Sequence, residues 1–550
     1  IKPVEQKKYD IVLNDQQQKV ADEIKKTITF EKNQAPNIHL IHGITGSGKT
    51  EVYMDLIDYT INKGKSVIVL IPDIALTYQT VMRFTRRFGD KVSIINSKLS
   101  KGERYDQFER AKNNDINIMI GPRSALFTPF KNLGLIVIDE EHEDAYKSES
   151  VPKYHAVEVA IKRAKDEGAT LVLGSATPSI ESFYRAKQGV YKLHTLSKRE
   201  KGQLAQVSVV DLREELKNEN KSIFSVQLQN LIQDRLEKKQ QTMLFINRRG
   251  YAGFVSCRDC GKPIKCPHCD VTLKLHRNRK MICHYCGHTE DMPKVCPQCG
   301  SVKLGGFGIG TQQIETAVKK MFPNSRVLRM DADTTSKKGG HEEILSAFAN
   351  GDADILVGTQ MIVKGHDFPK VTLVGVIAAD MSLYDADYRA AEKTFQLLCQ
   401  AAGRAGRSDL EGQVVIQTYA PDNYSIEAAS HQDYYEFYEQ EISYRKLMKY
   451  PPVSNMVSVL LQSKEQGSLN TNVRWLVSCI KEFKEKYFED LMVIGPAAPP
   501  VGKINDVYRK IVYLKSDNRI KMVGLKNYLE DVIKNSQNFK NISVQFDFKA

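Results

Sequence analysis

The segment Gly43–Thr50 reads GITGSGKT, which has the pattern of a phosphate-binding loop. An apolar run, IHLIH, precedes it and a helix-like stretch follows it, as such a loop requires. The glycines let backbone N–H groups turn toward phosphate oxygens, while Lys49 reaches the β- and γ-phosphates and Thr50 holds Mg²⁺. A chance Gly-rich turn is the alternative. The sequence predicts a site for ATP with Mg²⁺, formed by Gly43, Ile44, Thr45, Gly46, Ser47, Gly48, Lys49 and Thr50.

A second candidate for chemistry is the acidic end of the apolar run LIVIDEEH, Leu135–His142. The carboxyl ends of parallel strands meet at one edge of a sheet, so these acids are expected beside the phosphate loop. Asp139 would then belong to the Mg²⁺ shell, and Glu140 would orient and deprotonate the attacking water. The alternative is an acidic strand end that starts a helix.

Arginines that suit a developing phosphate charge occur in QAAGRAGR, Gln400–Arg407. Arg404 and Arg407 are three residues apart, so they share one face of a helical turn. A guanidinium offered from a second lobe would act as an arginine finger. The alternative is a pair of solvated arginines near a Gly-rich turn. GSATPS, Gly174–Ser179, is a weaker signal. It fits either a simple turn or an element that couples the state of the bound nucleotide to the polymer along which the protein moves.

Eight of the ten cysteines form four C-x-x-C pairs, which is the spacing of metal ligands. The pairs can combine as adjacent, interleaved or nested sets. A gap of thirteen residues between Cys269 and Cys283 resembles a zinc ribbon and favours nesting. Such all-cysteine sites are closed and structural. Nesting gives two zinc sites, of which one has Cys266, Cys269, Cys283 and Cys286, and the other has Cys257, Cys260, Cys296 and Cys299.

Two alternatives for the cysteines are disulfide-bonded or reactive thiols and an iron–sulfur cluster. The nearby histidines are interpreted as bystanders because eight thiolates already satisfy two ions. A basic face between the pairs would contact DNA, a protein partner or only water. This face comprises Lys274, Arg277, Arg279 and Lys280.

The elements that must position these residues form two series of apolar strands alternating with helical stretches, which indicates parallel sheets covered by helices. We expect an α/β fold with two RecA-like lobes, a cysteine-rich two-zinc insert in the second lobe, and a C-terminal α+β domain. An aromatic stripe, Tyr434–Tyr438, is interpreted mainly as core. The expected boundaries are a linker at 1–12, lobe 1 at 13–200, lobe 2 at 201–255 and 302–425, the insert at 256–301, and the C-terminal domain at 426–550.

The net charge of +13 suits a polyanionic partner, of which nucleic acid is the commonest. A solvated basic surface without a partner is the alternative. The longest apolar runs are shorter than a membrane span, and no signal peptide is visible, so a reducing cytosol is expected. Because the chain begins at Ile1, we expect that its native N-terminus is missing.

The ordered set GITGSGKT, LIPDIALTYQ, DEEH, GSATPS, VGTQMIVKGHDFP and QAAGRAGR resembles superfamily 2 helicases. DEEH, the four C-x-x-C pairs and YRAAEKTFQLLCQAAGRAGR together resemble the PriA family of bacterial replication-restart helicases (primosomal protein N′). The resemblance implies an ATP-dependent 3′→5′ DNA helicase that remodels stalled or forked DNA and starts primosome assembly. It also implies the nested zinc pairing, and a cytoplasmic, nucleoid-associated protein of a bacterium.

The same resemblance implies partners and further site residues. The partners are single-stranded and forked DNA, single-stranded DNA-binding protein and the primosome proteins that load the replicative helicase, with no membrane. Gln17 would read adenine, Tyr146 and Tyr154 would stack on single-stranded DNA, and Lys364 and His366 would communicate with DNA and nucleotide. Packing or surface roles are the alternatives for these residues. A DNA 3′-end-binding domain and a winged helix would precede this chain.

Two other functions are compatible with the motifs. An RNA helicase or a double-strand translocase would carry the same ATP motifs, since these motifs do not show which nucleic acid the protein moves along. A zinc-containing scaffold that recruits partners would use ATP as a switch.

Overall fold

A computed structural model describes residues 12–72, 78–97, 99–199, 203–246, 254–276, 279–306, 309–331, 333–335, 340–363, 368–406 and 410–549. The chain divides into two compact units. The first comprises Ile1–Gln206, Met361–Val374 and Cys399–Gln413, and the second comprises Val207–Gln360, Gly375–Leu398 and Val414–Ala550. No helix within the described ranges is both long and apolar enough to cross a membrane.

The first unit is built on a seven-stranded sheet with the order β3-β4-β2-β5-β6-β1-β7, in which every neighbouring pair is parallel. Its central strands are buried over their whole length because helices cover both faces. Its strands are β1 (Ile38–Gly43), β2 (Ser66–Leu70), β3 (Val92–Ile94), β4 (Ile118–Gly121), β5 (Leu133–Asp139), β6 (Thr170–Ser175) and β7 (Lys192–Leu196).

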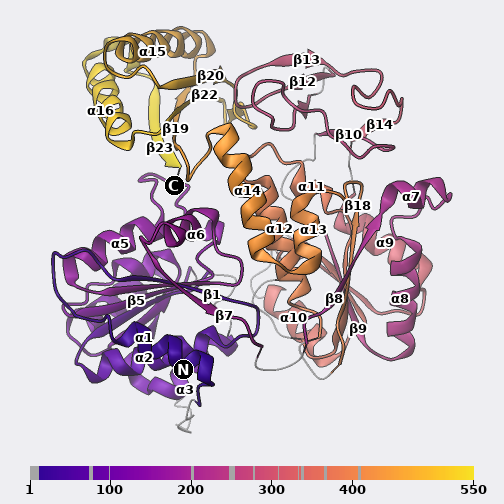
Figure 1. Cartoon of the computed structure of the whole chain (residues 1–550), viewed down its shortest axis with the longest axis horizontal. Helices are drawn as coiled ribbons and strands as arrows, with labels where there is room; N and C mark the ends of the chain where they lie inside the picture. The colour runs from indigo at the N-terminus through magenta and orange to yellow at the C-terminus, as the bar shows by residue number, and fades with distance from the viewer. Residues whose placement is uncertain are drawn as a thin grey trace. The chain divides into compact units, whose positions relative to one another are not determined.

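Among the described residues, six helices surround this sheet, with α1, α2 and α3 on one face and α5 and α6 on the other (Figure 1). α1 starts at a capping box, in which Asn14 and Gln17 exchange hydrogen bonds between side chain and backbone. The helices are α1 (Asp15–Lys25), α2 (Lys49–Asn62), α3 (Tyr78–Phe88), α4 (Lys101–Lys112), α5 (Ala156–Glu167) and α6 (Ile180–Lys187).

The second unit contains a six-stranded sheet with the order β15-β16-β9-β17-β18-β8. β15, β16 and β9 pair in parallel. Figure 1 shows α8 and α9 on one side of this sheet and α12 and α13 on the other. The strands are β8 (Gln206–Asp211), β9 (Gln241–Phe245), β15 (Val327–Met330), β16 (Ile355–Gly358), β17 (Val371–Val376) and β18 (Gln413–Thr418).

In the part of the chain that the structure describes, eight helices accompany the second sheet or lead out of it. α12 crosses from the second unit into the first at Cys399. They are α7 (Leu212–Lys217), α8 (Val226–Glu237), α9 (Thr311–Met321), α10 (Gly340–Asn350), α11 (Asp380–Leu383), α12 (Ala390–Ala402), α13 (Tyr424–His431) and α14 (Tyr434–Met448).

The cysteine-rich insert follows β9 within the second unit, and its described residues form only short strands. These are β10 (Val255–Cys257), which pairs with β14 (Leu304–Gly306), and the three-stranded β11 (Lys274–Leu275), β12 (Lys280–Ile282) and β13 (Thr289–Asp291). Strands of this length bury too little apolar surface to hold a fold, so another source of stability is required.

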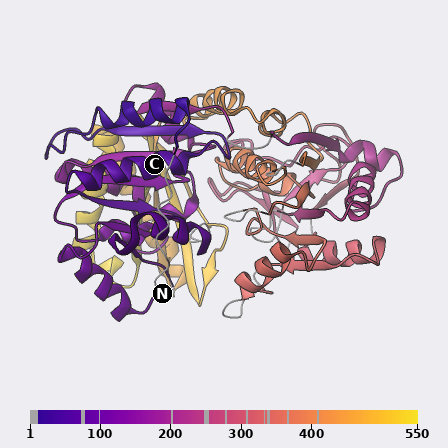
Figure 2. The same cartoon turned by 90° about the horizontal axis from the view of Figure 1, so that it is seen from below.

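The C-terminal domain is an antiparallel sheet with the order β20-β22-β19-β23 and a short β21 beside β22. Two helices, α15 (Gln466–Tyr487) and α16 (Arg519–Asn535), pack on one face of this sheet (Figures 1 and 2). The strands are β19 (Asn455–Ser463), β20 (Met492–Ala497), β21 (Lys503–Ile504), β22 (Val507–Ser516) and β23 (Ser543–Lys549).

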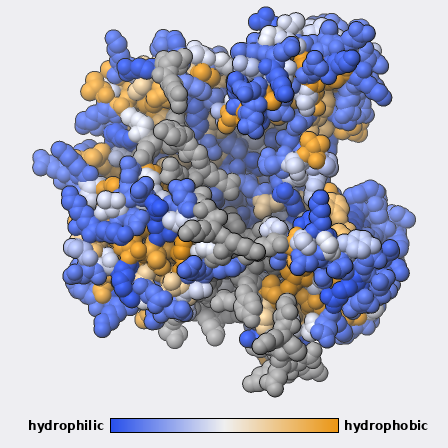
Figure 3. All heavy atoms as spheres, turned by 180° about the vertical axis from the view of Figure 1, so that it is seen from behind, coloured by the Kyte–Doolittle hydropathy of each residue, from blue (hydrophilic) through white to orange (hydrophobic). Residues whose placement is uncertain are grey.

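The predicted fold class is confirmed, because two helix-covered sheets, the cysteine-rich insert and an α+β C-terminal domain are all present. The aromatic stripe of α14 is mainly core, as expected, since Tyr434, Phe437 and Tyr438 are buried and Tyr435 is exposed. Hydrophilic residues predominate on the visible face of the described chain in Figure 3.

Candidate nucleotide site and metal centres

The loop between β1 and α2 forms a cradle whose shape depends on glycine. Gly46 and Gly48 have φ angles of +81° and +76°, which L side chains rarely adopt. A Cβ atom built on Gly43 would lie 2.6 Å from the Ser47 hydroxyl oxygen. That buried hydroxyl oxygen has no hydrogen-bond partner among the described residues. A turn that presents polar groups inward at a helix N-terminus fits a phosphate chain.

Two predicted residues tie this loop to its surroundings. The Lys49 ammonium is buried and donates to the Gly43 carbonyl over 2.8 Å, so it lies across the loop. The Gln17 side-chain amide donates to the Ser47 carbonyl over 3.0 Å, while its oxygen accepts from the Asn14 N–H. Gln17 thus connects the start of α1 to the loop, and reading of adenine by Gln17 stays a prediction.

The three acids after β5 have different surroundings. Asp139 is the last residue of β5, and the Tyr53 hydroxyl donates to its carboxylate over 3.2 Å. Burial, followed by the negative charge of Glu140, raises the Asp139 pKa to about 6, and the Lys49 charge opposes this shift. Glu140 has a φ angle of +48°, so the chain turns sharply there. Asp139 carboxylate and Thr50 hydroxyl oxygens are ligands of the kind that Mg²⁺ prefers.

Glu141, the third acid, has a structural role that the sequence analysis did not identify. Its buried carboxylate accepts from the Ser179 N–H over 2.6 Å and from the Ser182 hydroxyl over 2.8 Å. It therefore fixes the start of α6 behind the GSATPS turn. Burial raises the pKa of this carboxyl above its ordinary value.

Tyr53 is a further residue that the sequence analysis missed. It lies four residues after Lys49 on α2, hence on the same face, and this spacing was the available signal. A Cβ atom at Gly174 would lie 1.6 Å from its hydroxyl oxygen, so glycine is required there to admit the Tyr53–Asp139 contact.

His142 joins three of the predicted motifs within the first unit. Its Nδ1 atom lies 2.7 Å from the Ser175 hydroxyl of GSATPS, and its Nε2 atom lies 3.0 Å from the Gln400 amide nitrogen of QAAGRAGR. Gln400 also donates to the Glu143 carboxylate over 3.2 Å. Neither His142 nor Gln400 was predicted as a site residue.

QAAGRAGR also touches the phosphate-binding loop itself. A Cβ atom on Gly403 would lie 2.9 Å from the Thr45 side chain, so the backbone before Arg404 passes directly over the loop. Arg404 is half-buried. This proximity supports a role for Arg404 at bound phosphate, and that role stays a prediction. Arg407 lies outside the described residues.

The two tyrosines predicted to stack on DNA have different surroundings. Tyr146 is fully buried, and its hydroxyl donates to the carbonyl of Asp139 over 2.6 Å and of Leu70 over 3.0 Å. Its ring therefore offers no face to a base in this arrangement. Tyr154 is half-buried and meets Phe127, which is 51% exposed, edge to face at 5.5 Å. Lys364 and His366 lie outside the described residues.

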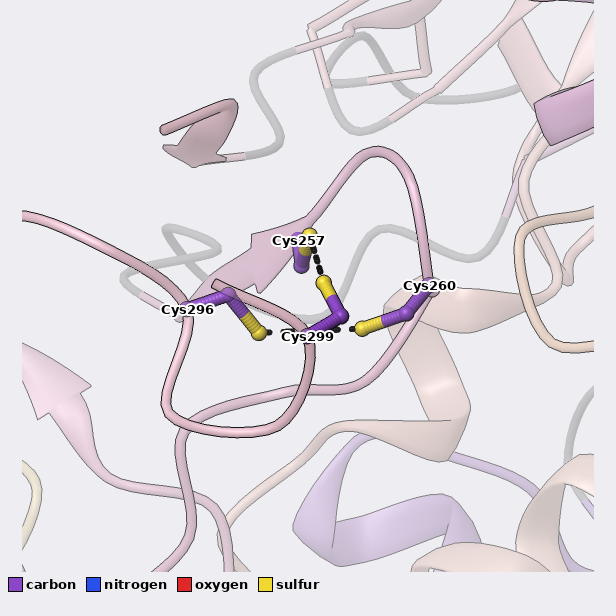
Figure 4. Close-up of side chains that lie close together, drawn as sticks. All are labelled: Cys257, Cys260, Cys296 and Cys299. Carbon is purple, nitrogen blue, oxygen red and sulfur yellow. Dashed lines mark hydrogen bonds between the residues drawn. The ribbon is translucent and has the colours of Figure 1, made fainter. Parts of the chain in front are cut away.

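The eight clustered cysteines form two groups of four, each with its sulfur atoms within 4.8 Å of one another. The outer centre contains Cys257, Cys260, Cys296 and Cys299, and its sulfur atoms point toward one another from two turns (Figure 4). The inner centre contains Cys266, Cys269, Cys283 and Cys286. The nested pairing is confirmed, and four thiols at this separation fit a tetrahedral Zn²⁺ ion.

Each C-x-x-C turn has the same backbone form. The residue after the second cysteine has a positive φ angle in all four turns, between +53° and +83°. The N–H of that residue donates to the carbonyl of the first cysteine over 2.9–3.0 Å. Such a turn directs both sulfur atoms to one point. The four residues are Gly261, Asp270, Gly287 and Gly300.

The fold and the site define a helicase-type P-loop protein with two four-cysteine groups that fit structural metal ions. Three family descriptions match the chain: "Type III restriction enzyme, res subunit" over residues 10–180, "PriA DNA helicase Cys-rich region (CRR) domain" over 266–290, and "Helicase conserved C-terminal domain" over 305–409.

Among its relatives, the replication restart protein PriA of Bacillus subtilis is 45% identical over 97% of this chain and 66% of that protein. PriA of Chlamydia pneumoniae is 43% identical over 92% of this chain and 67% of that protein. PriA of Rickettsia felis is 36% identical over 96% of this chain and 81% of that protein. The chain belongs to the PriA family of replication restart proteins.

The chain spans only part of its relatives, with 66% of the Bacillus subtilis protein and 59% of the one from Synechocystis matched. Among solved structures, the DUF1998 helicase MrfA bound to DNA is similar at a TM-score of 0.46 and 15% identity, over 78% of this chain and 48% of that one. A similarity at this level carries no information about function.

Proposed function

We propose that this chain is the motor core of an ATP-dependent 3′→5′ DNA helicase that acts in replication restart. The observation that carries the proposal is the chain of contacts from Ser175 through His142 to Gln400, with Gly403 against Thr45. These contacts connect the phosphate-binding loop, the acidic strand end and the arginine segment. Membership of the PriA family supplies the expected track and process.

In this proposal each residue at the nucleotide has a separate task. Lys49, which bonds to the Gly43 carbonyl, would pair with phosphate oxygens, and Thr50 and Asp139 would hold Mg²⁺, which would neutralise phosphate charge. Glu140 orients and deprotonates the attacking water, and Arg404 and Arg407 stabilise the charge that develops on the transferred phosphoryl group. Gln17 contacts the adenine.

The proposal extends to parts that surround the motor. The domains are a linker at 1–12, lobe 1 at 13–200, lobe 2 at 201–255 and 302–425, the insert at 256–301 and the C-terminal domain at 426–550. The partners are single-stranded and forked DNA, single-stranded DNA-binding protein and primosome proteins, in a bacterial cytoplasm. Tyr154, Lys364 and His366 are proposed to respond to DNA.

An unwinding assay under single-turnover conditions tests the track and its polarity. The substrates are 3′-tailed and 5′-tailed DNA duplexes and the matching RNA duplexes. We expect unwinding of the 3′-tailed DNA alone. The Lys49→Ala variant, which lacks the lysine proposed to bind phosphate, is the matched control and should unwind none of the substrates. Unwinding of RNA only, or of 5′-tailed DNA only, would overturn the proposal.

A hydrolysis assay separates the motor from a zinc-containing scaffold that uses ATP as a switch. Lys49→Ala and Glu140→Gln should each lower DNA-stimulated turnover by a factor of about 10² or more, because each removes a group needed at the transition state. Unchanged turnover in both variants would favour the scaffold.

Both cysteine centres are proposed to hold zinc. Elemental analysis of the purified protein should give two zinc per chain. Iron in place of zinc, or a single zinc, would contradict the nested two-zinc assignment.

A further inference from the structure

The inner cysteine centre packs on a cluster of four tyrosines that come from three separate parts of the second unit. We infer that the inner metal centre is the junction that fixes the C-terminal domain to the second sheet, and that Tyr450 is its principal positioning residue. We call the four tyrosines the junction cluster. They are Tyr285 of the insert, Tyr388 before α12, Tyr450 after α14, and Tyr513 of β22.

Tyr450 contacts each of the parts that meet at the junction. Its hydroxyl donates to the carbonyl of Cys269, a ligand residue of the inner centre, over 3.3 Å. Its ring stacks on Tyr388 with centroids 4.6 Å apart and planes 6° from parallel. On β22 of the C-terminal domain, the buried Lys515 ammonium lies 3.5 Å from the centroid of the Tyr450 ring. One side chain thus links the inner centre, the segment before α12 and the sheet of the C-terminal domain.

Tyr285 makes a parallel set of contacts from within the inner centre, since it lies between Cys283 and Cys286. Its ring stacks on Tyr513 of β22 at 4.7 Å and 12°. Its hydroxyl accepts from the N–H of Tyr388 over 3.4 Å. The position of Tyr285 is set by the C-x-x-C turn around it, so it depends on the metal that closes this turn.

The inner centre also contacts β20 and the residue that follows it. The Nδ1 atom of His284 lies 2.9 Å from the carbonyl oxygen of Ala498. A Cβ atom on Gly287, which has a φ angle of +83°, would lie 3.4 Å from the Pro496 carbonyl oxygen. His284, Tyr285 and Gly287 therefore all face the C-terminal domain.

The outer centre lies against a different part of the second unit. A Cβ atom on Gly261 would lie 1.8 Å from the Tyr419 carbonyl oxygen, just after β18. The Tyr384 hydroxyl donates to the Gly261 carbonyl over 2.7 Å, and Arg258 lies over the Tyr419 ring at 5.0 Å. The two centres can therefore be compared directly. Each joins two C-x-x-C turns, but the inner centre packs against the C-terminal domain and the outer centre packs against the segment after β18.

The junction reaches α12, the helix that ends in the arginine segment. The buried Arg445 of α14 pairs with Glu392 of α12 and with Glu441 of its own helix. The Arg445 guanidinium also lies 5.3 Å from the centroid of the Tyr388 ring. α14 and α12 are thus held together beside the junction cluster.

The decisive experiment compares loss of the inner and the outer metal in the full chain. Cys286→Ser removes a ligand from the inner centre and Cys299→Ser removes one from the outer centre. Each variant should retain one zinc by elemental analysis. The readouts are the rate of tryptic cleavage after the exposed Lys446 and Lys449, and the fluorescence anisotropy decay of Trp475, the single tryptophan, which lies on α15 of the C-terminal domain.

We expect Cys286→Ser to raise the cleavage rate at least tenfold and to add a fast component to the anisotropy decay, because the C-terminal domain then moves independently. Cys299→Ser should leave both readouts within twofold of the wild-type protein. Equal effects of the two variants, or a larger effect of Cys299→Ser, would overturn the inference.

A second pair of variants leaves all eight cysteines in place. Tyr450→Leu should retain two zinc and still raise cleavage at least fivefold, since the stack and the contact with Lys515 are lost. Tyr450→Phe keeps the ring and should change cleavage by less than twofold. Wild-type cleavage and anisotropy in Tyr450→Leu would show that Tyr450 does not position the domain. If Cys286→Ser does not fold, the two Tyr450 variants still test whether the junction cluster positions the C-terminal domain.

Discussion

The Nδ1 atom of His142 lies 2.7 Å from the hydroxyl oxygen of Ser175, while the opposite side of the same ring faces the Gln400 amide. The Ser175 hydroxyl also accepts from the Thr177 N–H over 2.9 Å. Because the Gln400 amide nitrogen donates to Nε2, the ring proton lies on Nδ1, which donates to the Ser175 hydroxyl. One ring bonds to two motifs far apart in the sequence.

We predict that His142→Ala lowers DNA-stimulated ATP turnover by about tenfold to a hundredfold, because one or two hydrogen bonds at ~1–2 kcal/mol each are lost. The KM for ATP should change by less than threefold, since His142 does not bond to the loop that holds the phosphates. Gln400→Ala should give a similar loss, and the double variant should add little to it. A KM effect without a kcat effect would refute this assignment.

Gly174 and Tyr53 provide a second test, which concerns packing. In Gly174→Ala the new methyl group would meet the Tyr53 hydroxyl, so we expect a destabilisation of about 1–3 kcal/mol and weaker ATP turnover. Tyr53→Phe alone removes the hydrogen bond to Asp139 at a cost of ~1 kcal/mol.

The double variant shows whether the loss of stability in Gly174→Ala comes from the contact with the Tyr53 hydroxyl or from a general disturbance of packing. Because Tyr53→Phe deletes the atom that the methyl group introduced by Gly174→Ala would meet, the two changes together should cost less than their sum, by at least ~0.5 kcal/mol in a thermal-unfolding cycle. Strict additivity would show that the two residues do not compete for the same space.

Much of this site could be predicted from residue types and spacing. The phosphate-binding loop, the acidic strand end and the nested cysteines are local patterns, in which two or three residues close in sequence determine the geometry. The contacts of Tyr53, Glu141 and His142 were not foreseen. Spacing places Tyr53 on the same face of α2 as Lys49. The side chains that Tyr53, Glu141 and His142 meet depend on which strands are neighbours, as in the order β2-β5-β6-β1, and spacing along the chain does not contain that order.

The junction cluster illustrates the same limit. Tyr285, Tyr388, Tyr450 and Tyr513 are spread over more than two hundred residues, and only Tyr285 lies in a motif for phosphate or metal. The spacing of the cysteines predicted their pairing but not what the paired turns pack against. Likewise, the family resemblance implied a stacking role for Tyr146, whereas the side chain is buried beneath the Asp139 carbonyl, as its alternative packing role requires.

A third prediction concerns the buried ion pairs of Arg445 with Glu392 and Glu441. Arg445→Met should destabilise the protein by about 3–5 kcal/mol, because both carboxylates then stay buried without their cation. Lys162→Ala, which breaks the exposed pair with Asp166, is the matched control and should cost less than ~1 kcal/mol. Differential scanning calorimetry measures both. Equal losses would mean that burial does not set the strength of the Arg445 pairs.

The last prediction concerns pH and the buried His39 in β1. The Thr27 hydroxyl donates to the Ile24 carbonyl and therefore accepts from Nε2 of His39, which leaves Nδ1 to accept from Nε2 of His194 over 3.0 Å. A second proton on Nδ1 of His39 would displace the Nε2–H of His194 and add a charge inside the buried sheet. Burial, then the nearby His194 and Lys192, lower the His39 pKa from 6.5 to about 3.

Between these two pKa values the unfolded chain holds more protons at His39 than the folded protein does. The free energy of unfolding therefore falls as the pH drops below 6.5, by on the order of 2 kcal/mol at pH 5. Urea unfolding followed by circular dichroism at pH 7 and pH 5 measures this loss. Glutamine does not titrate, so the His39→Gln variant should lose far less unfolding free energy between pH 7 and pH 5 than the wild-type protein does. If the variant loses as much as the wild-type protein, the loss arises at other groups.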